Sequence, residues 1–219
     1  VEPISVSLDC ALHLGDGPNG LLEHGPVDHV ITDWPYDPIV EAGNLAETVR
    51  NTGAYGFAAG TNELRDRAAQ AIAVQCRRWA LVCCAWEETH LWRMELERRG
   101  MIYIQQGSWV KTNPKPQMNG LGPASGAEAI VIFHSSTLSM RWNGGGKAAI
   151  WHHPVARGDD RIHTTQKPTS LMRDLIEDFT DPGESIADIF AGSATTLVVA
   201  QGLGRSAVGW EIDPDMHAQ

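Results

Sequence analysis

The chain has 219 residues, a length that fits one α/β domain and leaves little for a second one. Its net charge of −10 argues mildly against a nucleic-acid partner, because phosphate contacts need Lys and Arg, although only the contacting face must be positive. No apolar stretch approaches the roughly 18 residues needed to span a membrane, and we expect no signal peptide from the N-terminal sequence. The four cysteines show no CxxC spacing, which favours reduced, mostly buried thiols in a cytoplasmic protein.

Apolar periodicity and turn residues predict strands that alternate with helices. Residues 28–32 form a short apolar strand that stops at a Pro-containing turn, and Thr61 can cap a helix running to about Trp79. The run at 79–85 is continuously apolar, as in a strand covered on both faces. Further strands are expected at 101–111, 128–134, 184–190 and 206–212, and further helices at about 87–100, 169–180 (capped by Thr169) and 195–204. This alternation implies a parallel sheet with right-handed crossovers.

Residues 112–127 and 134–165 differ from the rest of the chain. They are rich in Gly, Pro, Asn, Ser and His, and long irregular segments in a compact domain are usually functional. Five basic residues in or beside these segments are the expected nucleic-acid contacts: Lys111, Lys115, Lys147, Arg157 and Arg161.

A turn of small residues near the C-terminus is typical of a nucleotide-binding site. The predicted strand ends at Phe190, and Ala191 to Ala194 precede a helix that begins at Thr195. Small residues let the backbone approach a ligand, and the helix start offers free N–H groups. Glu211, which ends the next strand, is placed to accept hydrogen bonds from ribose hydroxyls. The turn lacks the GxGxxG pattern, which favours S-adenosylmethionine over a dinucleotide, while an ordinary tight turn remains an equal alternative for this feature alone.

Asp33-Trp34-Pro35-Tyr36 follows the strand at 28–32, where α/β folds place active sites. To methylate an exocyclic amine of a base, an enzyme can accept both N–H hydrogens, one at a carboxylate and one at a backbone carbonyl. Asp33 and the Trp34 carbonyl are the candidate acceptors, Pro35 stiffens the loop, and Tyr36 offers a face for an extruded base. The same four residues would also make a good turn without any chemistry.

Taken together, these motifs resemble the β-group of DNA amino-methyltransferases, in which the catalytic motif precedes the cofactor motif. The family pattern of D-P-P-Y, Q-K-P, D-P-F-x-G-S-G-T-T and a final acid matches four segments: 33–36, 166–168, 188–196 and Glu211-Ile212. Leu14 to Asp16 resemble the upstream acidic element, and 109–116 with Glu128 resemble the segment behind the active site. The resemblance covers nearly the whole chain in the family's order.

The resemblance implies a Rossmann-like methyltransferase fold with a mostly parallel sheet, helices on both faces and a permuted motif order. It implies one domain over 1–219, with 112–165 as the target-recognition region. The substrate would be DNA, with N6 of a flipped adenine as the methyl acceptor, and the protein would be cytoplasmic and associated with the nucleoid. The implied catalytic residues are Asp33, Trp34, Pro35 and Tyr36, and the implied cofactor-binding residues are Asp16, Lys167, Pro168, Asp188, Phe190, Ala191, Gly192, Ser193, Thr195, Glu211 and Ile212.

Two departures from the family pattern leave alternatives open. Trp34 replaces the first proline of the catalytic motif, and Ala194 replaces the last glycine of the cofactor loop, where a methyl group could crowd the ligand or forbid a positive φ. The alternatives are an N4-cytosine enzyme, an RNA base methyltransferase and a catalytically weak homologue that binds DNA or a partner. A nucleotide-binding oxidoreductase is a poorer fit, and a homodimer is possible because little of the chain is left for target recognition.

Histidines and tryptophans give weaker signals. His152, His153 and His163 lack a Cys or carboxylate at ligand spacing, so no metal is expected. Trp79, Trp86 and Trp92 are predicted in the core. Trp109, Trp142 and Trp151 lie in or beside the irregular region, where an aromatic ring could fill the gap left by a flipped base.

Overall fold

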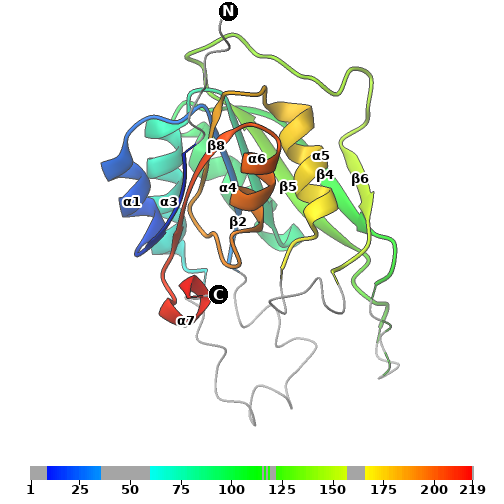
Figure 1. Cartoon of the computed structure of the whole chain (residues 1–219). Coiled ribbons are helices and arrows are strands. Elements are labelled where there is room, and N and C mark those ends of the chain that lie inside the picture. Colours follow the sequence, from blue (N-terminus) through cyan, green and yellow to red (C-terminus); the bar gives the residue numbers. More distant parts are fainter. Residues whose placement is uncertain are drawn as a thin grey trace, which may run out of the picture.

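A computed structural model describes residues 9–35, 60–114, 116, 118, 122–156 and 166–218. Its centre is an eight-stranded sheet in the order β1-β8-β7-β2-β3-β5-β4-β6 (Figure 1). The strands are β1 Cys10–Leu14, β2 His29–Asp33, β3 Trp79–Cys84, β4 Ile102–Lys111, β5 Ala127–His134, β6 Ile150–His153, β7 Ser185–Asp188 and β8 Ser206–Glu211. The helices are α1 Gly17–His24, α3 Asn62–Gln75, α4 Thr89–Glu97, α5 Thr169–Phe179, α6 Thr195–Gly202 and α7 Pro214–His217, with a short 3-10 turn at Trp86–Glu88.

The strand directions decide where functional side chains gather. β5 is antiparallel to both of its neighbours, and every other neighbouring pair is parallel. Seven strands therefore end at one edge, hereafter the carboxyl edge, where β5 begins. In a doubly wound sheet this edge holds the ligand sites.

Helices cover both faces of the sheet, as predicted. On one face, Leu21 of α1, Ala68 and Ile72 of α3 and Trp92 of α4 pack against the strands. On the other face, α5 and α6 pack against the strands (Figure 1). Six of the eleven residues of α5 are buried. The amphipathic pattern at 169–180 is therefore explained by burial of one helix face.

Several element boundaries differ from the predictions. Thr61 caps α3 as expected, accepting from the Leu64 backbone N–H at 3.1 Å, but the helix ends at Gln75. It cannot reach Trp79 because Val27 forms a β-bridge with Cys76, which pulls the backbone into an extended path. Thr169 is the first residue of α5 and not its cap; Pro168 occupies the capping position. The segment 134–165 was expected to be irregular, but it contains β6, which pairs with β4.

The tryptophans and cysteines also test predictions. Trp79 and Trp92 are buried as predicted, whereas Trp86 is 43% exposed, so its prediction was wrong. Trp109 and Trp151 are fully packed in the core, which contradicts a role for either ring beside a flipped base. All four cysteines are free thiols, and three of them are buried. Within the described residues, no helix is long and apolar enough to cross a membrane.

Candidate active site

Asp33 is the last residue of β2 and lies at the carboxyl edge, in the middle of the sheet. Its Oδ2 accepts a hydrogen bond from Lys167 Nζ at 2.7 Å. Its Oδ1 is buried and receives no hydrogen bond from any described residue. A buried carboxylate oxygen without a donor is costly unless a ligand supplies one, so Oδ1 is a hydrogen-bond acceptor that the described residues leave unused. Tyr36, the last residue of the predicted catalytic motif, lies outside the described residues.

A line of alternating charges runs from Asp33 along the carboxyl edge. Lys167 bonds Asp33 on one side and Glu128 on the other, at 2.7 and 3.0 Å, and its side chain is only 7% exposed. Glu128 also pairs with Lys111 at 2.8 Å. Glu128 is near the start of β5, and Lys111 ends β4, so the antiparallel pairing of these strands brings them to Asp33. Each of these buried charges has an oppositely charged neighbour, which offsets the free-energy cost of removing it from water.

The four side chains of Asp33, Lys167, Glu128 and Lys111 are called the ion chain below. Its two carboxylates have very different pKa values. Burial raises the pKa of Asp33 to about 6; Lys167 opposes the rise, whereas Glu128 and Asp188 add to it. Burial alone would also raise the pKa of Glu128, but the ammonium groups of Lys167 and Lys111 lower it to about 2. Glu128 is therefore a permanent anion at neutral pH, and Asp33 is the group that titrates.

The cofactor turn lies between β7 and α6, also at the carboxyl edge. Gly192 has a φ of 50° and Ala194 a φ of 56°, so Ala194 adopts the left-handed conformation that the family's glycine would take without strain. The methyl group of Ala194 thus does not forbid a positive φ. Glu211 at the end of β8 accepts hydrogen bonds from the backbone N–H groups of Gly192 and Asp213, both at 2.8 Å. These bonds fix the turn against β8.

Asp188 is fully enclosed and acts as a brace between the two motifs. Its carboxylate accepts from the hydroxyls of Thr32 and Thr196, both at 2.7 Å, and from the Phe190 backbone N–H at 3.1 Å. Burial raises its pKa, and these three hydrogen bonds oppose the rise. Because Thr32 precedes Asp33 and Thr196 lies in the first turn of α6, Asp188 holds the end of β2 beside the turn between β7 and α6.

Asp16 adjoins this turn from the other side. It caps α1 through the Asn19 backbone N–H, and both of its oxygens pair with Arg67 of α3 at 3.0 Å. A Cβ on the next residue, Gly17, would lie 1.8 Å from the Ile189 carbonyl oxygen, so α1 begins directly against the β7 turn. Two apolar side chains lie next to Glu211, and each is 54% exposed. Leu14 is its partner at the end of β1, and Ile212 follows it in the chain.

The expected cofactor residues therefore converge on one edge. Asp16 and Glu211 supply carboxylates, Ile212 an exposed apolar surface, and Lys167 and Pro168 a buried border. Phe190, Ala191, Gly192 and Ser193 form the turn itself, and Thr195 begins α6 directly after it. Asp188 ends β7 behind the turn, where it is buried and bonded to Thr32, Phe190 and Thr196, so it supports the turn from below. Contacts of these residues with a cofactor stay a prediction.

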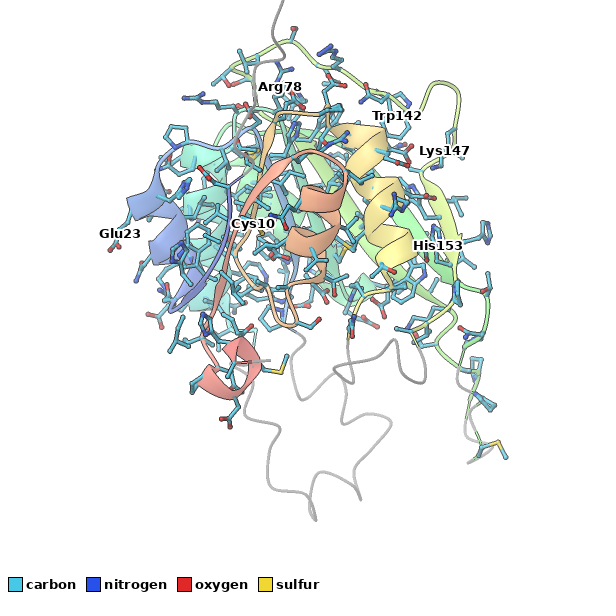
Figure 2. All side chains as sticks on the ribbon, in the orientation of Figure 1. Cys10, Glu23, Arg78, Trp142, Lys147 and His153 are labelled. Carbon is cyan, nitrogen blue, oxygen red and sulfur yellow. The ribbon has the colours of Figure 1, made fainter. Side chains whose placement is uncertain are left out.

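The basic residues expected to meet nucleic acid are placed differently. Lys111 is paired with Glu128 inside the ion chain. Lys147 pairs with Asp178 and Asp174 of α5 at 2.6 and 3.6 Å, and in Figure 2 it lies beside that helix. β6 runs toward the carboxyl edge, so Lys147, three residues before it, lies away from Asp33. The other three expected contacts, Lys115, Arg157 and Arg161, lie outside the described residues.

Of the three histidines considered for a metal site, His153 pairs with Asp174 at 3.0 Å, and His163 lies outside the described residues. In the part of the chain that the structure describes, no group of three His, Cys, Asp or Glu side chains is arranged to hold a metal ion.

Several residues that support the motifs were missed from the sequence. Thr32, Arg67 and the pair Arg65–Glu88 each bond a predicted site residue, but they belong to no recognisable motif. One signal in the sequence was available for this pair. The amphipathic spacing of α3 places Arg65 next to its buried positions, and a buried arginine needs a carboxylate partner.

Comparison with known proteins finds similarity to DNA methyltransferases over part of the chain. Residues 138–219 match the model of a DNA methylase family, N6_N4_Mtase. The type II methyltransferase M.HinfI of Haemophilus influenzae is 29% identical over 121 residues, which cover 47% of this chain and 34% of that protein. M2.DpnII of Streptococcus pneumoniae is 29% identical over 136 residues, covering 56% and 51%. The matched segments thus span between a third and a half of these curated relatives.

Solved structures show the same fold over most of the chain. The M1.HpyAVI–SAM complex superposes with a TM-score of 0.71 at 20% identity, covering 94% of this chain and 96% of that one. The cytosine-N4-specific PvuII DNA methyltransferase gives a TM-score of 0.66 at 15% identity, covering 95% and 83%. The fold is therefore the Rossmann-like methyltransferase fold that the motif order implies. Residues 138–219 and the two aligned segments are thus similar to DNA methyltransferases, and the solved structures add the fold alone.

Proposed function

We propose that this protein transfers a methyl group from S-adenosylmethionine to an exocyclic amine of a DNA base, with N6 of adenine as the acceptor. The observation that carries the proposal is the open acceptor on Asp33: a buried Oδ1 without a donor among the described residues, on a carboxylate whose other oxygen is anchored by Lys167. A base amine is a donor that suits such a site. Its N–H can bond Oδ1 without displacing a partner among the described residues.

Asp33 would orient the amine, stabilise the positive charge that develops on its nitrogen and accept its proton. Its pKa of about 6 keeps it mostly ionised at neutral pH, so it attracts the hydrogen of a nitrogen that becomes positive as it is methylated. The proton lost by the amine can pass to this carboxylate, whose raised pKa makes it a better base than an exposed aspartate. The Trp34 carbonyl follows directly in the chain and would accept the second N–H.

The residues at the carboxyl edge fit the proposed cofactor. Glu211 uses each carboxylate oxygen for one backbone N–H, and a carboxylate has about four acceptor positions, so ribose hydroxyls can still bind. The exposed side chains of Leu14 and Ile212 beside it suit an adenine ring. S-adenosylmethionine, when bound, supplies the electrophilic methyl group on its sulfonium. The turn at 190–195 would hold its methionine end beside Asp33.

Adenine is favoured over cytosine because the catalytic motif begins with Asp, whereas the N4-cytosine branch resembled by the same motifs usually begins with Ser. Fold similarity does not separate the two, since a cytosine-N4-specific enzyme is among the similar structures. Target recognition is assigned to the parts of 112–165 outside the sheet strands β5 and β6. Lys115, Arg157 and Arg161 remain expected phosphate contacts there.

A transfer assay tests this proposal. Purified protein is incubated with methyl-labelled S-adenosylmethionine and mixed-sequence DNA, single- and double-stranded, with RNA in a parallel reaction. Asp33→Ala is compared with Glu23→Gln, which changes an acid on the outer surface of α1 (Figure 2). Label in DNA that disappears in Asp33→Ala and persists in Glu23→Gln supports the proposal. Label only in RNA, or none despite measurable cofactor binding, would overturn it.

A further inference from the structure

The side chain of Trp34 is the point where this chain departs from the family's catalytic motif, and it is completely buried. Its Nε1 donates a hydrogen bond to Glu88 Oε1 at 2.8 Å. The same oxygen accepts from Arg65 at 2.6 Å, and Arg65 also bonds Asn62, so both charged partners are fixed on α3 and the turn before α4. The indole therefore anchors the catalytic turn to a buried ion pair.

Aromatic contacts extend this anchor to the cofactor turn. The Trp34 ring meets Trp92 of α4 and Phe190 edge-on, with ring centroids 5.0 and 5.4 Å apart. Phe190 is the first residue of the cofactor turn. The Arg65 guanidinium lies 5.2 Å from the centre of the indole, a favourable cation–π distance. One side chain thus contacts both the helical layer and the turn expected to hold the cofactor.

The backbone closes over the same ring. A Cβ on Gly60 would lie 2.7 Å from Trp34 Nε1 and 2.4 Å from the Pro35 carbonyl oxygen, so only glycine fits there. On the opposite side, the Trp34 backbone N–H donates to the Cys83 carbonyl at 2.9 Å. The residue is held by its main chain, its ring and its N–H group together.

We infer that Glu88 is a positioning residue for methyl transfer: through the Trp34 indole it fixes the backbone carbonyl next to Asp33, replacing the rigidity that a proline gives other family members. A proline restricts its own backbone, whereas a tryptophan does not, so the carbonyl needs an external anchor. This inference rests on the proposed function. Among the described residues, Glu88 bonds neither Asp33 nor the cofactor turn, and its influence on the site passes through Trp34.

The chain contains a matched control for this arrangement. Trp151 Nε1 donates to Asp178 at 2.9 Å, and Asp178 also pairs with Lys147, as Glu88 pairs with Arg65. Trp151 is equally buried but packs on the other face of the sheet, against α5. Trp151→Phe removes the same kind of hydrogen bond without touching the catalytic turn.

The test compares Trp34→Phe, Glu88→Ala and Glu88→Gln with Trp151→Phe. We expect Trp34→Phe and Glu88→Ala to lower kcat at least about tenfold with an unchanged Kd for S-adenosylmethionine, and Glu88→Gln, which keeps an acceptor, to retain kcat within about threefold. Trp151→Phe should keep the wild-type kcat. Wild-type kcat in Trp34→Phe or in folded Glu88→Ala, or an equal loss in Trp151→Phe, would overturn the inference. If Glu88→Ala does not fold, Trp34→Phe decides alone.

A second readout needs no activity. The indole N–H resonance of Trp34, identified by its loss in Trp34→Phe, should exchange slowly with solvent and shift in Glu88→Ala while Trp151 stays unchanged. A fast-exchanging Trp34 N–H in the wild type would overturn the anchor itself. Absence of methyl transfer with a protected Trp34 N–H would instead refute the proposed function and leave the anchor intact.

Discussion

Asp33 and Lys167 are 134 positions apart in sequence, yet their side chains form a 2.7 Å hydrogen-bonded ion pair at the carboxyl edge of the sheet. The pair occupies Oδ2 of Asp33, while Oδ1 receives no hydrogen bond from any residue that the structure describes. Burial raises the pKa of Asp33 to about 6 despite the cation in contact, and the charge of Glu128, which also pairs with Lys167, adds to the rise.

Asp33→Asn should separate catalysis from stability. The amide cannot accept a proton and presents a donor, so methyl transfer should fall at least about 100-fold. The folded-state pKa of Asp33 is raised above its ordinary value of 3.8, so ionised Asp33 opposes folding at neutral pH. The Asp33→Asn variant should therefore be more stable than the wild type by about 1 kcal/mol at pH 7.5, measured by urea unfolding.

The difference in unfolding free energy between the wild type and Asp33→Asn should depend on pH, and this dependence serves as a control. Below pH 4 the Asp33 carboxyl group is protonated in the folded and the unfolded state and does not oppose folding. As the pH rises through about 6 it ionises in the folded state, and the free energy of unfolding of the wild type falls relative to its value at pH 4. The unfolding free energies of the wild type and the Asp33→Asn variant should therefore converge as the pH falls toward 4. A variant that is less stable than the wild type at pH 7.5 would contradict the raised pKa.

Methyl transfer should rise with pH through a midpoint near 6 at saturating substrates. Below this pH Asp33 is protonated and can no longer accept the amine hydrogen. The measurement is initial rate against pH from 5 to 8, restricted to conditions in which the protein is folded. A flat profile across pH 6 would exclude Asp33 as the titrating group.

Glu128→Gln should move that midpoint to lower pH by about half a pH unit or more. Glu128 is an anion with a pKa of about 2, and it raises the pKa of Asp33 through its charge and through its share of Lys167. Asp174→Asn, which changes an acid of α5 that pairs with Lys147 and His153, serves as the control. A midpoint that stays in place or moves upward would refute the proposed coupling.

Ala194→Gly should stabilise the protein by about 0.5–1 kcal/mol. Ala194 has a φ of 56°, a conformation that strains a residue with a Cβ by about 1–2 kcal/mol, and part of the gain is offset by the flexibility of glycine in the unfolded chain. Ala200→Gly in the interior of α6 should instead destabilise by about 1 kcal/mol. Thermal unfolding measures both. Loss of stability in Ala194→Gly would show that the strain is not relieved by glycine.

Glu211→Ala should weaken S-adenosylmethionine binding at least about tenfold. The variant removes a ribose acceptor and also the two backbone bonds that fix Gly192 and Asp213. Calorimetric titration measures the Kd, with Glu23→Gln as the control. An unchanged Kd would place the ribose elsewhere.

The sequence was most informative where chemistry and local structure coincide. The turns that follow β2 and β7 were predicted to within two residues, because each follows a short apolar strand and is marked by Pro or small residues. The strand predicted to end at Phe190 ends at Asp188. β1 and β6 were missed because edge strands with exposed or histidine-rich residues lack a continuous apolar pattern. A strand defined mainly by its partner leaves little trace in its own sequence.

The ion chain could not be predicted for a related reason. Lys111 was expected to contact phosphate, since a lysine beside an irregular segment is usually free to do so. The antiparallel pairing of β4 with β5 places it instead against Glu128. Likewise, the sequence shows Trp34 only as a departure from the proline of the family's catalytic motif. Its hydrogen bond to Glu88 becomes visible only when the ring is seen packed against α3 and α4.

Identification of the methylated nucleoside tests the proposed activity most directly. DNA treated with the protein and S-adenosylmethionine is digested to nucleosides and analysed by mass spectrometry, with Asp33→Ala in parallel. We predict N6-methyldeoxyadenosine that is absent from the Asp33→Ala reaction. N4-methyldeoxycytidine as the product would contradict the adenine assignment, and the absence of any methylated nucleoside, with cofactor binding intact, would contradict the proposed activity.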